Sequence, residues 1–361
     1  MLRRPPLTPP PSDRGSIGTG PSAAMAAAAP RRAAGAVARG LGLVAGGVAL
    51  LGGAGTVWAD PSELPPSFNY NYGEAENARV IAMGSALSAF GNGTAAPFVN
   101  PANLTLTRVY HFEAIAQFTP EGRRQVYGGS VVDSTRRFAG GVGVMGGFID
   151  PDGVNRSYLD VRLALAFQVA DELSVGLGGR FLNMEQQGLG PLGDSLASGG
   201  RKDAEDPPVG RKPILSVPTL DAGVSLRPTE GLNIGLVGKN LTYSNNAFLP
   251  TIVGGGIGYG DEDLTLEADA LADLNSYLKP TARVGAGGEY LIADAVPVRI
   301  GYRFDQGAAS HALTAGVGYV HTAFSAELGL RRTLVGPSAT SIVLNIAYHL
   351  ESSGLTEIEE F

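Results

Sequence analysis

The chain has 361 residues, of which 44 % are apolar, 17 % are charged and 52 are glycine. Its net charge is −7, and binding to nucleic-acid phosphates needs a basic face, so nucleic acid is excluded as the main partner. The sequence contains no cysteine, which excludes a disulfide framework, a thiolate metal site and a cysteine nucleophile.

The first sixty residues are typical of an export signal. Arginines precede an apolar run over 40–57, and compact residues then offer a signal-peptidase site after Ala59. We therefore expect residues 1–59 to be a signal peptide, with Met25 as an alternative start. The other interpretation is an N-terminal membrane anchor, because the run approaches the length of a spanning helix.

From His111 onward, apolar and polar residues alternate with a period of two, which is typical of strands with two different faces. In the segment 158–169, for example, Leu163 belongs to an apolar face and Arg162 to a polar one. A soluble antiparallel sandwich also alternates, but its strands run about 5–6 residues, whereas a tilted membrane strand needs about 9–11. The longer strands expected here are 111–119, 125–133, 137–146, 158–170, 172–183, 213–228, 231–240, 249–259, 263–273, 278–291, 296–304, 309–319, 321–331 and 338–350.

The predicted connections alternate in length. Every second one is tight, as at 134–136 and 170–171, and the intervening ones are mostly longer, as at 147–157 and 184–212. Short periplasmic turns and longer outside loops are typical of outer-membrane barrels. We therefore predict an all-β fold, a transmembrane antiparallel β-barrel of about fourteen strands in the bacterial outer membrane, in contact with membrane lipid and lipopolysaccharide.

The region before the first strand does not alternate. Residues 74–90 are expected to form a short helix, and the segment is long enough to fill the lumen as a hatch, or plug. The predicted organisation is a signal peptide at 1–59, an N-terminal extension and hatch at 60–110, the barrel at 111–350 and a periplasmic C-terminal tail at 351–361.

Charged residues of both signs recur on the face opposite the apolar one. Such charges are costly toward lipid but can pair across a lumen. They form either a polar conduit or a salt-bridged network that holds barrel and hatch rigid. Glycines on this face, among them Gly176, Gly285 and Gly287, let strands curve or a plug approach closely. The predicted luminal charges are Asp160, Arg162, Arg180, Asp221, Glu267, Arg283, Glu289, Arg299, Arg303 and Glu327.

The segment 78–86 (ARVIAMGSA), followed by small residues and by Asn100-Pro101-Ala102 just before the alternating region, resembles the outer-membrane long-chain fatty-acid transporter (FadL-like) family. It is similar also to that family's secretion-associated (PorV-like) relatives. The resemblance implies a fourteen-stranded barrel plugged by an N-terminal hatch that contains the Asn-Pro-Ala segment. Members studied for transport take up hydrophobic molecules, and others act as shuttles or accessories for exported proteins.

Two functions therefore stay open. The first is a channel for hydrophobic small molecules such as long-chain fatty acids, and the alternative is a non-transporting barrel that serves a secretion system or envelope complex as an accessory protein. Apolar hatch residues would line a ligand pocket in the first case, or simply pack the plug against the wall. The candidate ligand-binding residues are Val80, Met83, Leu87, Phe90, Phe98, Asn100, Pro101, Ala102 and Leu104.

The sequence offers no catalytic machinery that we can identify. Gly141 to Gly146 match G-x-G-x-x-G, but turn residues follow instead of a helix, so a glycine-rich strand is the better interpretation. The four histidines lie near strand ends without the spacing of a metal site. A set of Ser325, His349 and Asp269 would be an arbitrary choice of triad. We predict a protein that is not an enzyme and has no cofactor or metal.

Overall fold

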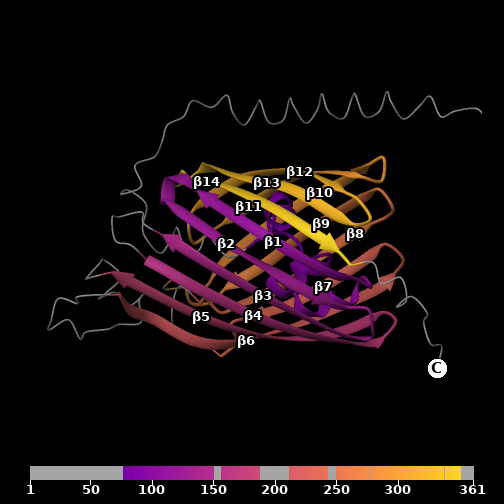
Figure 1. Ribbon diagram of the computed structural model, residues 1–361, viewed down its shortest axis with the longest axis horizontal. Helices are drawn as coiled ribbons and strands as arrows, with labels where there is room; N and C mark the ends of the chain where they lie inside the picture. Colours follow the sequence, from indigo (N-terminus) through magenta and orange to yellow (C-terminus); the bar gives the residue numbers. More distant parts are fainter. Residues whose placement is uncertain are drawn as a thin grey trace, which may run out of the picture.

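The computed structural model describes residues 76–149, 156–187, 211–242, 249–277, 279–336 and 338–350. Fourteen antiparallel strands close into one barrel in which each strand pairs with its neighbours in the sequence (Figure 1). The barrel closes where β14 (Thr340–His349) pairs with β1 (Tyr110–Thr119). This confirms the predicted fold class and strand number.

The other strands follow in chain order. They are β2 (Arg124–Asp133), β3 (Phe138–Ile149), β4 (Arg156–Ala170), β5 (Leu173–Gln187), β6 (Arg211–Thr229), β7 (Leu232–Lys239), β8 (Ile252–Gly260), β9 (Leu264–Asp273), β10 (Thr281–Ile292), β11 (Val296–Asp305), β12 (Ser310–Val320) and β13 (Phe324–Val335).

Most predicted strand limits are close to these bounds, and the differences have local causes. The strand expected at 321–331 begins at Phe324, because the His321 N–H closes a turn onto the Phe324 carbonyl at 2.8 Å. The strand expected to end at 183 continues to Gln187, since its pairing with β6 extends to that residue.

Burial alternates along the strands as the two predicted faces require. On β4, Asp160 and Arg162 are buried, whereas Leu163 is 49 % exposed. Every one of the fourteen strands carries at least one exposed large apolar side chain, and together these form a continuous apolar outer face that suits contact with lipid. Tyr158, by contrast, points into the lumen and is 6 % exposed.

The two ends of the barrel differ. The turns 134–137, 171–172 and 230–231 lie at one end, which we call the short-turn end. The opposite end, where β5 ends and β6 begins and where Asn240 and Thr251 lie, is called the long-loop end.

A luminal segment, residues 76–109, lies inside the barrel (Figure 1, indigo). It contains α3 (Ala78–Ala82), η2 (Gly93–Ala95), α4 (Ala96–Val99) and η3 (Pro101–Thr105). The helix predicted over 74–90 is wrong in extent, because Gly84 and Ser85 adopt left-handed conformations with φ of 68° and 63° that no helix continues.

Several predictions fall on residues that the structure does not describe. The signal peptide at 1–59, the first part of the extension at 60–110 and the tail at 351–361 lie outside the described residues. No helix in the ranges described is long and apolar enough to cross a membrane.

Candidate functional site

Inward-facing glycines let the luminal segment lie directly on the barrel wall. A Cβ on Gly329 would lie 2.4 Å from Ile81 Cγ2, and one on Gly176 would lie 2.3 Å from the Ala102 nitrogen. Any larger residue at these places would push the luminal segment away from the wall. On other strands, a Cβ would also meet atoms of the luminal segment at Gly143, Gly223, Gly235, Gly258, Gly285, Gly287, Gly301 and Gly316.

Two buried carboxylates of β9 bind the backbone of the luminal segment. The Ser88 N–H and hydroxyl donate to Asp269 at 3.0 and 2.6 Å. The N–H groups of Ala89 and Phe90 donate to Glu267 at 2.5 and 3.0 Å. These charge-assisted bonds satisfy peptide donors that would otherwise be buried without partners. They fix the middle of the luminal segment to one strand.

A buried ionic cluster joins β4 and β5. Asp160 accepts from Arg162 at 3.1 Å and from Arg180 at 2.7 Å, and all three side chains are at most 4 % exposed. Arg162 also donates to the carbonyl oxygen of Phe98 at 3.3 Å, and Lys239 donates to the same oxygen at 3.1 Å. The cluster thus holds the luminal segment as well as the wall.

A second network lies on β10, β11 and β13. Glu289 pairs with Arg79 of the luminal segment at 2.9 Å and with Arg299, which in turn pairs with Glu327 at 2.8 Å. The ten predicted luminal charges all lie on the inner face, and each of them is ion-paired or hydrogen-bonded. Further examples are the ion pair of Arg283 with Asp273, that of Arg303 with Glu76, and the hydrogen bond from the Asn240 N–H to Asp221. This arrangement favours the interpretation of a rigid salt-bridged network over an open polar conduit.

The nine candidate ligand-binding residues do not form one pocket. Val80, Met83 and Leu87 pack on one another with Phe90 within the luminal segment. Phe98 joins an apolar cluster of the wall, and Leu104 joins a separate one. The Asn-Pro-Ala segment has a structural role at the start of η3. The Asn100 side chain caps η3 by accepting the Ala102 N–H at 3.1 Å, and Pro101 is the first residue of η3. The Asn100 amide also donates to the Ser88 carbonyl at 2.8 Å.

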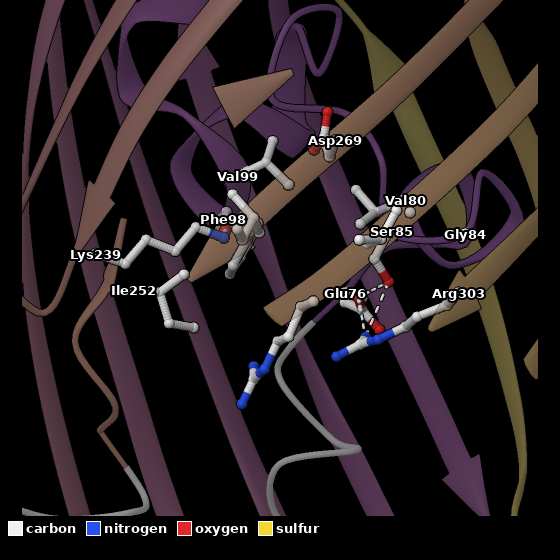
Figure 2. Close-up of a pocket in the computed structure, with 14 residues that line it drawn as sticks. Glu76, Val80, Gly84, Ser85, Phe98, Val99, Lys239, Ile252, Asp269 and Arg303 are labelled. Atoms are coloured by element: carbon white, nitrogen blue, oxygen red, sulfur yellow. Dashed lines mark hydrogen bonds and ion pairs between the residues drawn. The ribbon is translucent and has the colours of Figure 1, made fainter. Parts of the chain in front are cut away.

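Val80 and Phe98 line a cavity of about 40 Å³ on the long-loop side of the luminal segment, which we call the outer cavity (Figure 2). Its walls mix apolar and charged side chains. Phe98, Val99 and Ile252 lie on one side of the view, and Glu76, Ser85 and Arg303 form a bonded group on the other (Figure 2). Lys239, Asp269, Leu271 and Arg283 complete the lining.

Phe98 also belongs to an apolar inner wall in the long-loop half of the barrel. Its wall members come from β1 to β6, from β14 and from Leu249, and they include Met145, Leu182 and Met184, which are fully buried. Ala78 and Ile81 of α3 pack on it together with Phe98. The strict alternation rule missed the wall residues, because it assigns polar residues to the inner face. The available signal was local: apolar residues occupy inward as well as outward positions in 181–184.

A larger cavity of about 190 Å³, the inner cavity, lies on the short-turn side of the luminal segment. It opens at the seam between β1 and β14, where the rings of His111 and His349 stack at 4.1 Å. Its lining is mostly polar and includes Asn77, Arg79, Asn92, Thr94, Glu113, Ser325 and Glu327. Among the described residues, the geometry is thus a closed barrel with a cavity on either side of a bound luminal segment.

No protein-family model matches the sequence, and no curated protein matches it. The fold is nevertheless that of known membrane channels. The toluene transporter TbuX of Ralstonia pickettii matches with a TM-score of 0.55 at 16 % identity, over 76 % of this chain and 98 % of that one.

Two further solved structures match over similar shares of the chains. A FadL homologue of Pseudomonas aeruginosa gives a TM-score of 0.56 at 13 % identity, covering 76 % of this chain and 98 % of its own. The monoaromatic hydrocarbon channel CymD gives 0.54 at 15 % identity, covering 76 % and 97 %. The predicted resemblance to the fatty-acid transporter family is therefore supported at the level of the fold, and the resemblance to secretion-associated relatives stays a prediction.

Proposed function

We propose that this protein is a bacterial outer-membrane channel for hydrophobic small molecules, with its ligand site on the long-loop side of the luminal segment. The observation that carries the proposal is the apolar inner wall around Met145, Leu182 and Met184, which continues onto Phe98 beside the outer cavity. A hydrophobic ligand seated against this surface gains about 25 cal/mol for each Å² removed from water.

Long-chain fatty acids are the cargo that we propose within this class. Positive side chains, those of Lys239, Arg283 and Arg303, lie around the same cavity as the apolar residues. Arg283 and Arg303 already pair with Asp273 and Glu76, so the carboxylate of a fatty acid would pair with Lys239 while its chain packs on Phe98 and Ile252. The likeness of the fold to hydrocarbon channels supports an uncharged aromatic cargo equally.

The test is binding of a fluorescent fatty acid to the purified full chain in detergent. Phe98→Ala should weaken binding about tenfold or more, because an aromatic contact of the ligand is lost. Phe90→Ala is the matched control and should leave affinity unchanged, since Phe90 packs against Gly258 and Gly260 and does not line the outer cavity. Competition by toluene and by an uncharged alkane then separates aromatic, acyl and anionic preference.

Equal weakening by both phenylalanine variants would contradict the proposed site. Absence of binding by every hydrophobic probe would contradict the channel itself. If a stoichiometric envelope protein were then recovered with the barrel, the accessory function would replace it.

A further inference from the structure

Two histidines from opposite ends of the chain meet at the seam where the barrel closes. His111 on β1 and His349 on β14 are direct partners in the register, and their rings stack at 4.1 Å with 21° between the ring planes. Residues directly opposite each other on one face of an antiparallel pair have Cβ atoms about 5 Å apart, which brings both imidazoles within reach of one ion. Both side chains line the inner cavity. Spacing along the chain, on which the prediction of no metal site rested, does not show this pair, because closure of the barrel creates it.

The hydrogen bonding of His349 leaves a nitrogen lone pair for a ligand. Its Nδ1 lies 3.3 Å from the carbonyl oxygen of Thr322. A carbonyl oxygen only accepts, so Nδ1 carries the proton and, in the neutral ring, Nε2 keeps its lone pair. Histidines that bind a metal ion usually donate their other ring nitrogen to a carbonyl or carboxylate oxygen in this way. His349 is thus held in the form that a metal ligand requires.

A buried carboxylate beside the histidines has one oxygen without a partner. Glu113 is the next inward residue of β1 after His111, lines the inner cavity and is 8 % exposed. One of its oxygens accepts from the Asn345 amide at 2.5 Å and from the Asn77 amide at 3.5 Å. The other oxygen has no hydrogen-bond partner among the described residues. A buried carboxylate is costly unless it is paired, and neutral amides do not neutralise its charge.

The other charges around the inner cavity already have partners. Arg79 pairs with Glu289 at 2.9 Å, and Glu327 pairs with Arg299 at 2.8 Å. With neutral histidines, Glu113 therefore leaves the lining of the inner cavity with an uncompensated negative charge. The cavity volume of about 190 Å³ also has room for several waters, since a water occupies about 30 Å³ in the liquid. Both observations favour a hydrated cation.

The types of donor select the class of cation. Imidazole nitrogens suit Zn²⁺, Cu²⁺ and Ni²⁺, whereas Ca²⁺ and Mg²⁺ prefer oxygen ligands. In the described part of the chain, no group of three or more His, Cys, Asp or Glu side chains could hold such an ion together, so water must complete its coordination. We propose that His111 and His349 bind a divalent transition-metal ion at the barrel seam, with Glu113 neutralising it through bound water in the inner cavity. The ion clamps the first strand to the last.

The first experiment titrates Ni²⁺ into the purified full chain in detergent, without a histidine tag, in a calorimeter. The wild type should bind one ion per chain, and His111→Gln and His349→Gln should each weaken binding about tenfold or more, because each removes a protein ligand. His311→Gln is the matched control, since this histidine lies in β12 at the opposite, long-loop end of the barrel. His321→Gln covers the remaining histidine of the chain. Both controls should leave the affinity unchanged.

The second experiment identifies the ligands and the role of the carboxylate. Electron paramagnetic resonance of bound Cu²⁺ should show two imidazole nitrogens in the wild type and one in His111→Gln or His349→Gln. Glu113→Gln should weaken Ni²⁺ binding about tenfold while both nitrogens remain, because it removes a charge but no direct ligand. Ser325→Ala, which removes a neutral polar group of the same cavity, is the control and should leave the affinity unchanged.

The third experiment measures the clamp as stability. At an ion concentration a hundred times the dissociation constant, the ratio of folded to unfolded chain in urea should rise about a hundredfold for the wild type. For His349→Gln at the same concentration, it should rise no more than about tenfold, because the ion binds this variant more weakly.

Three results would overturn the proposal: Ni²⁺ binding without a defined stoichiometry, equal weakening by His311→Gln, or a Cu²⁺ spectrum without imidazole nitrogens. Unchanged affinity in Glu113→Gln would contradict the role of that carboxylate and mean that a proton neutralises it. Should His349→Gln fail to fold, His111→Gln and the wild-type spectrum still decide. The site does not rest on the proposed channel function, so failure to bind any hydrophobic ligand would leave it standing.

Discussion

The two sides of the lumen are built from the same alternating strands and yet are lined differently. In the long-loop half of β1 to β6, inward positions carry large apolar side chains such as Met145 and Met184, interrupted by the ionic cluster around Asp160. On β9 to β13, most inward positions carry charged residues or glycine, and α3 rests on the backbone at Gly316 and Gly329.

This difference separates two tasks. An apolar wall stabilises a hydrophobic ligand without directional bonds, so the ligand can slide along it. A wall of charges and glycine holds a polypeptide segment at fixed points through directional bonds and close backbone contact. The outer cavity lies where the two walls meet: Phe98 packs on the first wall, and Asp269, Arg283 and Arg303 of the second wall line the cavity.

The largest loss of stability should come from removing the Asp160 carboxylate, which pairs with two arginines in the first wall. Asp160→Ala leaves Arg162 and Arg180 buried without a carboxylate, and this should lower the free energy of unfolding by about 3–5 kcal/mol. On the second wall, Glu327→Gln leaves Arg299 paired with Glu289, so the loss should be about 1 kcal/mol. Urea unfolding of the barrel in lipid vesicles, followed by far-UV circular dichroism, measures both.

Arg162→Ala provides the control for that comparison. Asp160 keeps Arg180 at 2.7 Å in this variant, so we expect a loss of about 1 kcal/mol, as for Glu327→Gln. If Asp160→Ala lowered the free energy of unfolding no more than the other two changes, the ionic cluster around Asp160 would not be a main source of stability in the first wall.

The next largest loss of stability should come from charges on the outer face. It should be the same for both walls, because they differ only in the side chains that face the lumen. Leu163 on β4 is 49 % exposed and Ile300 on β11 is 69 % exposed, and both face outward. Arginine at either position near the middle of the membrane should destabilise the barrel by about 2–4 kcal/mol. Ile346→Arg on β14 should behave alike. Tolerance on one side only, in the same unfolding assay, would mean that this side does not face lipid.

Strand positions were predictable from the sequence because period-two alternation is a local property of each strand. The assignment of Leu163 outward and Arg162 inward needed no knowledge of the neighbouring strands. The pairing of charges did need it. Asp160 meets Arg180 only because the β4–β5 register sets Arg162 opposite Arg180, and no rule on one strand supplies that register.

The candidate site was harder to predict for the same reason. The nine residues chosen in the predicted hatch are apolar or belong to its Asn-Pro-Ala segment, but whether such a residue lines a cavity or packs inward depends on how the luminal segment folds on itself. Leu87 packs against other residues of that segment, whereas Phe98 reaches the outer cavity. The end of α3 depends on the left-handed conformation at Ser85, which a serine seldom adopts, so the longer helix predicted there was a reasonable expectation.

The smallest effect concerns the glycines of the two walls. A Cβ on Gly329 would lie 2.5 Å from the Ala78 carbonyl oxygen, which is backbone of α3 and cannot turn aside. A Cβ on Gly143, on the apolar side, would meet the tip of the Phe98 ring at 2.6 Å, and a side chain can rotate. We expect Gly329→Ala to lower the free energy of unfolding by about 1–3 kcal/mol and Gly143→Ala to cost less. Gly179→Ala, which meets nothing within 4 Å, is the control and should change stability little. Equal losses at Gly329 and Gly143 would show that the backbone of α3 yields as readily as the Phe98 side chain, and the backbone contacts of the second wall would then be no more rigid than the side-chain contacts of the first.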